Sequence, residues 1–111
     1  MNFQQQLDLE EQDIKKNMLY GNAKVIMRGV ATIDEELYNL AMFNLFELET
    51  DQKKKDESRK QIEGMKINGI SNSPAITLGT RGEIADGNHR ICALFESKIA
   101  FHTSILLRRN T

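Results

Sequence analysis

Apolar residues recur every three or four positions between Thr32 and Leu48, and this spacing predicts an amphipathic helix. The segment opens with "TIDE", a capping box in which Thr32 and Glu35 each satisfy a free amide of the other. Its last part, "MFNLFELE", also alternates well enough for a strand. Residues 44–49 are therefore open to both interpretations.

The chain before this helix has a weaker pattern. A thin apolar stripe predicts a helix over about 6–19, which Gly21 would end. The next run, "AKVIMRG", alternates and predicts a short strand. In that strand we expect Val25 and Met27 to lie on the same side.

Glycine and proline divide the second half of the chain into short elements. The charged run 51–60 reads as a solvated loop followed by the first turn of a helix, which Asp56 or Ser58 would cap and Gly69 would end. Strands are predicted at "AITL" and "EIAD", joined by the tight turn "GTRG". After "DGNHR" we expect a helix and a closing strand, with His102 at the surface.

Composition narrows the class of protein. The chain has 111 residues, of which 40% are hydrophobic and 28% charged, as in a globular domain with one core. The net charge is −1, so direct DNA binding through bulk charge is not favoured. No apolar run approaches the roughly 20 residues that span a bilayer, and no secretory signal pattern is present. The single cysteine, Cys92, suits a reducing compartment. We therefore expect a cytoplasmic protein with no membrane partner.

The candidate chemistry lies at the predicted strand-to-helix corner, Asp86-Gly87-Asn88-His89-Arg90. The first turn of a helix has free amides and a partial positive charge, which suit a phosphate. Gly87 lets a ligand approach the backbone, and His89 and Arg90 add donors. Asp86 makes sense there if it holds Mg²⁺, receives a proton or orients His89. The alternative is an ordinary turn in which Asn88 caps the helix.

The order helix, strand, turn, strand, "DGNHR", helix, strand resembles the ParB/sulfiredoxin superfamily from about Lys55 to Leu107. The corner is similar to the Asp-Gly-His-His-Arg of free serine kinases. Sulfiredoxins have a nucleophilic cysteine where this chain has Asn88, and ParB proteins continue into a DNA-reading domain that we do not expect here. The resemblance implies a small α+β domain, with helices packed on a short mixed sheet, over residues 31–111. Residues 1–30 would be an N-terminal extension made of a helix and a short strand.

The resemblance also implies site residues. The following would bind the phosphates of ATP or another nucleoside triphosphate: Gly87, Asn88, His89 and Arg90. Asp86 would hold Mg²⁺. Asp86, His89 and an upstream carboxylate would act in catalysis. Glu49 is the first candidate for that carboxylate, with Glu47 and Asp51 as the others.

Several functions stay open. The first is nucleotide binding with Mg²⁺-dependent phosphoryl transfer or nucleotide hydrolysis. The second is a non-catalytic interaction module or inhibitor, for example a phage or mobile-element accessory protein, whose N-terminal segment contacts a host protein or a nucleic-acid-processing complex. A nuclease is least favoured, because no carboxylate cluster stands out in the sequence. The nucleotide-binding enzyme predicts that Asp86, His89 and Arg90 open into a pocket opposite an acid from 47–51. The second predicts that Asp86 and Arg90 pair and close the corner.

Overall fold

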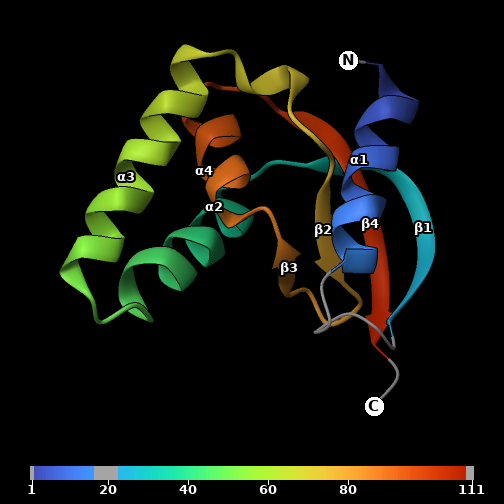
Figure 1. Ribbon diagram of the computed structural model, residues 1–111, viewed down its shortest axis with the longest axis horizontal. Helices are drawn as coiled ribbons and strands as arrows, with labels where there is room; N and C mark the ends of the chain where they lie inside the picture. The colour runs from blue at the N-terminus through green and yellow to red at the C-terminus, as the bar shows by residue number, and fades with distance from the viewer. Residues whose placement is uncertain (1, 17–22, 110–111) are drawn as a thin grey trace.

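The computed structural model describes residues 2–16 and 23–109, which form an α+β fold (Figure 1). The elements follow one another as α1 (Phe3–Lys16), β1 (Ala23–Thr32), α2 (Glu35–Met42), the π-helical turn η2 (Phe43–Glu47), α3 (Gln52–Ile67), the 3-10 turn η3 (Ile70–Asn72), β2 (Ile76–Gly79), β3 (Ile84–Asp86), α4 (Asn88–Glu96) and β4 (Phe101–Arg109). None of the described helices is long and apolar enough to cross a membrane.

The strands form one mixed sheet in the order β1-β4-β2-β3. The closing strand β4 is antiparallel to β1 and parallel to β2, while β2 and β3 form an antiparallel hairpin. The hairpin turns where Gly82 donates to the carbonyl of Gly79 at 3.1 Å, which confirms the predicted tight turn. The α+β fold with a short mixed sheet is confirmed.

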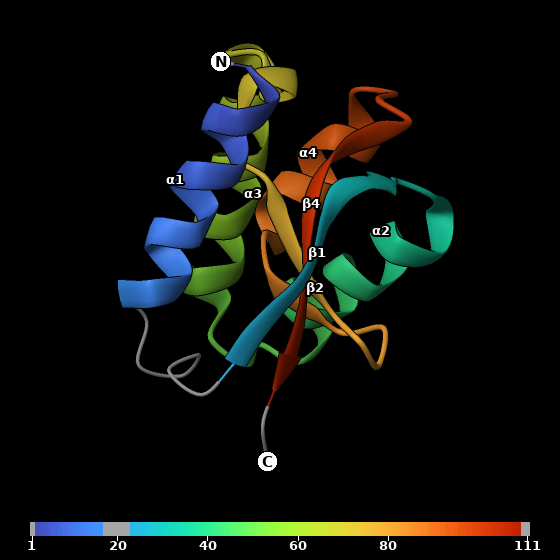
Figure 2. The ribbon, with the colours of Figure 1, turned by 90° about the vertical axis from the view of Figure 1, so that its right-hand side faces the viewer.

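Helices cover both faces of this sheet (Figures 1 and 2). On one face, Leu7 and Ile14 of α1 pack against Ile105 and Leu107 of β4. On the other face, α4 supplies the centre of a larger core to which α2, α3 and β2 also contribute: Ala41, Ile62, Ile76, Ile91, Cys92, Ala93 and Leu94. The predicted boundary near residue 30 falls inside β1, which pairs with β4 on both sides of that position.

A polar cluster joins the three helices on the second face. Glu96 of α4 accepts from the Tyr38 hydroxyl at 2.8 Å, from Arg59 Nη1 at 3.1 Å and from Lys66 Nζ at 3.2 Å. Although partial burial opposes ionisation, these three donors hold the pKa of Glu96 below its usual value. The Tyr38 ring also stacks on Phe95, with ring centroids 4.3 Å apart. The cluster therefore fixes how α2 and α3 sit against α4.

The helix predicted from Thr32 begins later than expected. Thr32 belongs to β1, and the cap is Asp34, whose carboxylate accepts from the Leu37 amide at 2.8 Å. The predicted capping box is therefore wrong: pairing with β4 extends the strand through Thr32. The ambiguous residues 44–49 are not a strand, because the helix continues from α2 into η2.

The helix predicted near Ser58 begins earlier than expected. The side chain of Asp51 caps α3 by accepting from the Lys53 amide at 3.0 Å, so the charged run is helix rather than loop. Lysine, arginine, glutamine and glutamate, which make up most of this run, are good helix formers, and most of the run is exposed. The predicted end is confirmed, because Gly69 follows α3 with φ +83°.

Strand β1 contains an irregularity that its alternating letters conceal. Val25 pairs with Leu107 and Met27 with Leu106, so a bulge separates them. Leu106 and Leu107 are consecutive residues of β4 and face opposite sides of the sheet, so their partners Met27 and Val25 also face opposite sides. The prediction that they share one side is wrong. The end expected for the first helix near Gly21 lies outside the described residues.

Gly87 joins β3 to α4 and has no room for a side chain. Its φ is +105°, and an added Cβ would lie 3.0 Å from Cγ2 of Ile76. We expect Gly87→Ala to destabilise the protein by about 1–3 kcal/mol in urea unfolding, because alanine would be strained there. Gly64→Ala is the matched control. No atom lies within 4 Å of its added Cβ, so it should be stabilising by up to about 1 kcal/mol. Equal effects of the two substitutions would contradict this account.

Candidate functional site

The corner after β3 presents the start of a helix. The strand ends at Asp86, Gly87 is the N-cap, and α4 begins at Asn88. Ile91 makes the first helical bond, with its amide 2.8 Å from the Gly87 carbonyl oxygen. No side chain of the described residues caps the earlier amides. The predicted role of Asn88 as cap is wrong, and the corner keeps the donors and partial positive charge of a helix start.

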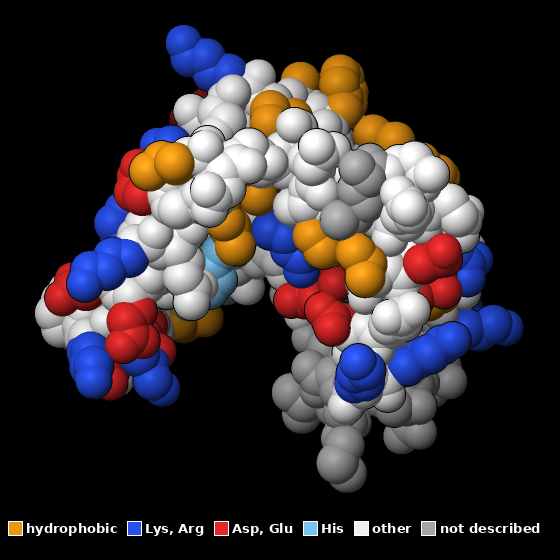
Figure 3. All heavy atoms as spheres, turned by 45° about the horizontal axis from the view of Figure 1, so that its top comes forward, with side chains coloured by type: hydrophobic (Ala, Val, Ile, Leu, Met, Phe, Trp, Pro, Cys, Tyr) orange, Lys and Arg blue, Asp and Glu red, His pale blue; other side chains and the backbone are white. Residues whose placement is uncertain are grey.

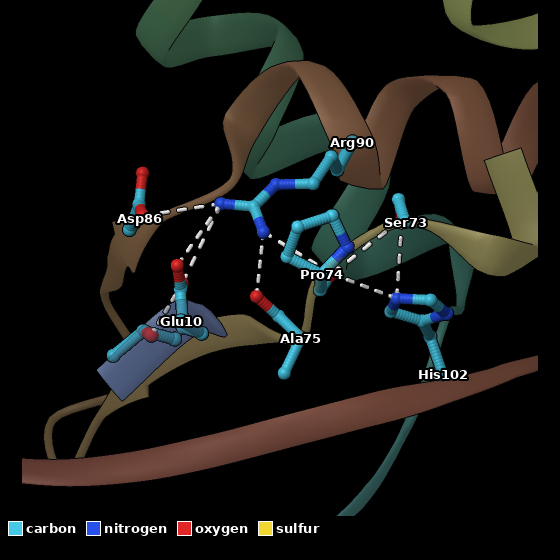
Figure 4. A network of polar contacts seen from close by, with 8 residues as sticks. Glu10, Ser73, Pro74, Ala75, Asp86, Arg90 and His102 are labelled. Carbon is cyan, nitrogen blue, oxygen red and sulfur yellow. Dashed lines mark hydrogen bonds and ion pairs between the residues drawn. The ribbon is translucent and has the colours of Figure 1, made fainter. Parts of the chain in front are cut away.

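The Arg90 side chain turns away from solvent and binds the protein itself (Figure 4). Nη1 donates to the carbonyl oxygens of Pro74 and Ala75, at 3.1 and 2.6 Å. Nη2 lies 3.1 Å from the Asp86 carboxylate and 3.5 Å from that of Glu10. Only 12% of the side chain is exposed. Arg90 is thus engaged on four sides, and its guanidinium is a structural group in this conformation.

Glu10 brings α1 into the same network. Its carboxylate is fully buried, accepts from the Thr77 hydroxyl at 2.7 Å and faces Arg90. Burial raises its pKa to about 7, although Arg90 and the Thr77 hydroxyl act in the opposite direction. The sequence predicted only a loosely held helix there, so this buried acid was missed. Glutamate is a surface residue in most helices, and nothing near Glu10 in sequence indicates its distant partners.

His102 and Ser73 support the loop that receives Arg90. His102 is only 5% exposed, and its Nε2 lies 3.0 Å from the Pro74 carbonyl oxygen and 3.3 Å from Ser73 Oγ. The predicted surface position of His102 is therefore wrong. The same carbonyl of Pro74 accepts from Arg90, so the loop before β2 is held from two directions (Figure 4).

The other two polar side chains of the corner reach neighbouring elements. Asn88 accepts a hydrogen bond from Asn44 of η2 at 3.0 Å, and His89 Nε2 lies 2.9 Å from the Ser58 hydroxyl of α3. Burial lowers the pKa of His89, and the positive charge of Arg90 adds to that effect. His89 is therefore neutral near pH 7 and has both a donor and an acceptor nitrogen.

This side of the molecule is hollowed (Figure 3). The space-filling view shows a deep notch with a histidine on its wall and basic and acidic side chains at its inner end. Of the two histidines, His102 is buried and His89 is partly exposed. The notch lies between two parts of the surface.

A carboxylate cluster that was not expected from the sequence lies beside Arg90. One oxygen from each of Glu10, Asp13 and Asp86 lies within 4.8 Å of the others, so the three could hold a metal ion. Carboxylate oxygens are the ligands that Mg²⁺ prefers. Asp86, which was predicted to hold Mg²⁺, belongs to this cluster, and the other two carboxylates come from α1. The sequence did not indicate this cluster, because α1 and β3 are far apart along the chain.

The upstream acids make local contacts. Glu49 accepts from the amides of Thr50 and Asp51, at 3.0 and 3.3 Å, and lies 3.9 Å from Lys54 Nζ. Asp51 caps α3. Among the described residues, no hydrogen bond or ion pair joins Glu47, Glu49 or Asp51 to the corner. The expected catalytic carboxylate is therefore not brought into contact with Asp86 or His89.

Cys92 lies one turn after Asn88 in α4 and is fully buried. Burial raises the pKa of its thiol to about 12, so the thiolate is not formed at neutral pH. Cys92 is a packing residue of the core on the second face of the sheet.

Comparison with models of protein families, with curated proteins and with solved structures finds no match to this chain. The resemblance to the ParB/sulfiredoxin superfamily therefore stays a prediction from the sequence.

The raised pKa of Glu10 makes stability depend on pH. The folded protein keeps a proton on Glu10 up to about pH 7, whereas the unfolded chain releases it near 4.5. The folded state binds more protons between these values, so this contribution to stability is present below pH 4.5 and lost by about pH 7. We expect Glu10→Gln to gain on the order of 3 kcal/mol relative to wild type between pH 4.5 and 8 in urea unfolding.

One matched control accompanies this measurement. The lowered pKa values of His89 and His102 act in the opposite direction, but they are common to both proteins and cancel in the difference. Glu57→Gln makes the same change on an exposed side chain. A difference between wild type and Glu10→Gln that is the same at both pH values would mean that Arg90 keeps Glu10 ionised throughout.

Proposed function

We propose that this protein binds the phosphate groups of a nucleotide at the start of α4. The observation that carries the proposal is a strand-to-helix corner with Gly87 as N-cap, whose first turn no side chain of the described residues caps. Main-chain amides at such a position bind phosphate, and the helix dipole adds to the attraction. The neutral ring of His89 adds one donor beside these amides.

The proposal changes the role that the sequence indicated for Arg90. Its guanidinium holds the fold together, so phosphate recognition falls to the amides of Gly87, Asn88 and His89. The resemblance of "DGNHR" to the corner of free serine kinases supports the same site. The two motifs share the glycine at the turn, Gly87 in this chain, as well as the arginine.

Mg²⁺ is the cofactor that this site fits. Phosphate beside Glu10, Asp13 and Asp86 would be repelled, and a divalent cation bound by those carboxylates would remove the repulsion. Burial raises the pKa of Glu10 to about 7 despite the opposing charge of Arg90, and a cation bound beside it would favour its ionised form. Bound there, Mg²⁺ would supply positive charge for the phosphate oxygens.

We expect nucleotides to stabilise the folded protein. Ligand that binds only the folded state raises the free energy of unfolding by about 2.7 kcal/mol at a hundredfold excess over Kd. Thermal unfolding with ATP, CTP, GTP and ADP, each with and without Mg²⁺, measures this. His89→Ala should weaken binding about fivefold through loss of one hydrogen bond. Asp86→Asn should reduce the dependence on Mg²⁺.

The choice of variants follows from the fold. Arg90→Ala would unfold the corner whether or not phosphate binds there, so it does not test this proposal. Arg81→Ala, on the exposed turn between β2 and β3, is a control substitution away from the corner and should leave binding unchanged. No midpoint shift with any of the nucleotides, at concentrations up to several millimolar, would contradict the proposal.

One observation favours a second candidate function. Asp86 and Arg90 pair at 3.1 Å, as expected for an interaction module whose corner is closed. Exposed apolar side chains on the N-terminal segment would suit a protein partner: Phe3, Leu9, Ile26, Met27 and Val30. If no nucleotide binds, a non-catalytic module that contacts a host protein or a nucleic-acid-processing complex becomes the better account, and a cytoplasmic partner of that kind should be sought.

A further inference from the structure

Ser58 stands at a position where serine has no local role. It lies inside α3, well past the Asp51 cap, and serine is a weak helix former that favours caps and turns. The contact that accounts for it is with α4: its hydroxyl oxygen lies 2.9 Å from Nε2 of His89. The residue is only partly buried.

The two side chains have the geometry of a nucleophile and its base. A serine hydroxyl is a weak nucleophile until a neighbouring base takes its proton, and the base must lie within hydrogen-bond reach. Half-burial lowers the pKa of His89, so its ring is neutral near pH 7 and its Nε2 can accept the Ser58 proton. The charged groups that act on His89 are Arg90 and Asp86, and they oppose one another.

The pair also stands next to the proposed phosphate site. His89 is in the first turn of α4, so the Ser58 hydroxyl is held at the helix end whose amides would bind phosphate. We propose that Ser58 is a phosphoryl acceptor, to which a nucleoside triphosphate bound at this corner transfers its terminal phosphoryl group. This rests on the proposed nucleotide site and adds a reaction and an acceptor to it.

The transfer is balanced without a further reactant. The Ser58 oxygen attacks the γ-phosphorus and forms the new P–O bond, while the bond between the γ-phosphorus and the β-γ bridging oxygen breaks. The proton of the hydroxyl moves to Nε2 of His89. The products are phosphoserine, a nucleoside diphosphate and an imidazolium that returns its proton to solvent. The first-turn amides would stabilise the charge on the transferred group.

Intact-mass measurement tests this directly. Wild-type protein incubated with ATP, CTP or GTP and Mg²⁺ should gain the mass of one phosphoryl group, mapped by peptide fragmentation to Ser58. Ser58→Ala should abolish the gain, whereas Ser58→Thr should retain part of it because a hydroxyl remains. His89→Gln should slow it about 10²–10⁴-fold, the usual effect of losing a general base. Ser71→Ala, an exposed serine on η3, should react like wild type.

The same samples separate the two proposals. Thermal unfolding reports whether each variant is folded and whether nucleotide binds. Binding without any phosphoserine would overturn the acceptor role and leave the nucleotide site standing, with Ser58 and His89 serving only to tie α3 to α4. Neither binding nor modification would overturn both. Modification that persists in folded Ser58→Ala would place the acceptor elsewhere.

Discussion

The buried guanidinium of Arg90 is the group on which the arrangement of this protein depends. It connects the first turn of α4 to the loop before β2, to the end of β3 and to α1 on the opposite side. A buried charge is costly unless it is paired and hydrogen-bonded, so these partners must all stay in place together. No buried side-chain nitrogen or oxygen of the described residues is left without a partner. The position of α4, and with it the direction of its first amides, is a consequence of this network.

Local signals in the sequence predicted much of the fold. Gly69, the Gly79–Gly82 turn and the Gly87 corner were placed correctly, because each needs a backbone geometry that favours glycine. Starts of helices were less predictable. Asp34 and Asp51 compete with nearby Thr32, Asp56 and Ser58 as caps, and only the surrounding structure selects among them. The alternating letters of β1 also concealed a bulge that depends on its pairing with β4.

The site was predicted in part, for a related reason. The corner itself is a continuous stretch of sequence, so its residues could be named. The groups that surround it come from distant segments: Glu10 and Asp13 from α1, Ser58 from α3 and Asn44 from η2. The letters "DGNHR" also do not show which way a side chain turns. Arg90 turns inward because carbonyl oxygens and carboxylates bind its guanidinium there. These partners come from segments that are far from Arg90 in the sequence.

The segment from Asp86 to Arg90 has two roles in our account, one structural and one in binding. The side chain of Arg90 holds the fold, while no side chain of the described residues caps the first amides of α4. His89 takes part in both roles, because its side chain contacts α3 and its main chain lies in the first turn of α4. In our account, α1 completes the site by bringing two carboxylates beside Asp86. The N-terminal helix would then support the function of the corner as well as cover the sheet.

The most direct test of this division is a nuclear magnetic resonance titration of ¹⁵N-labelled protein with ATP and Mg²⁺. The account predicts saturable shifts of the Asn88 and His89 amide signals, while the side-chain Nε signal of Arg90 keeps its position and its slow exchange with water. Amide signals of α4 that do not move would contradict phosphate binding at the helix start. An Arg90 Nε signal that shifts strongly or exchanges faster would show that its side chain leaves the network to bind the ligand, which the account excludes.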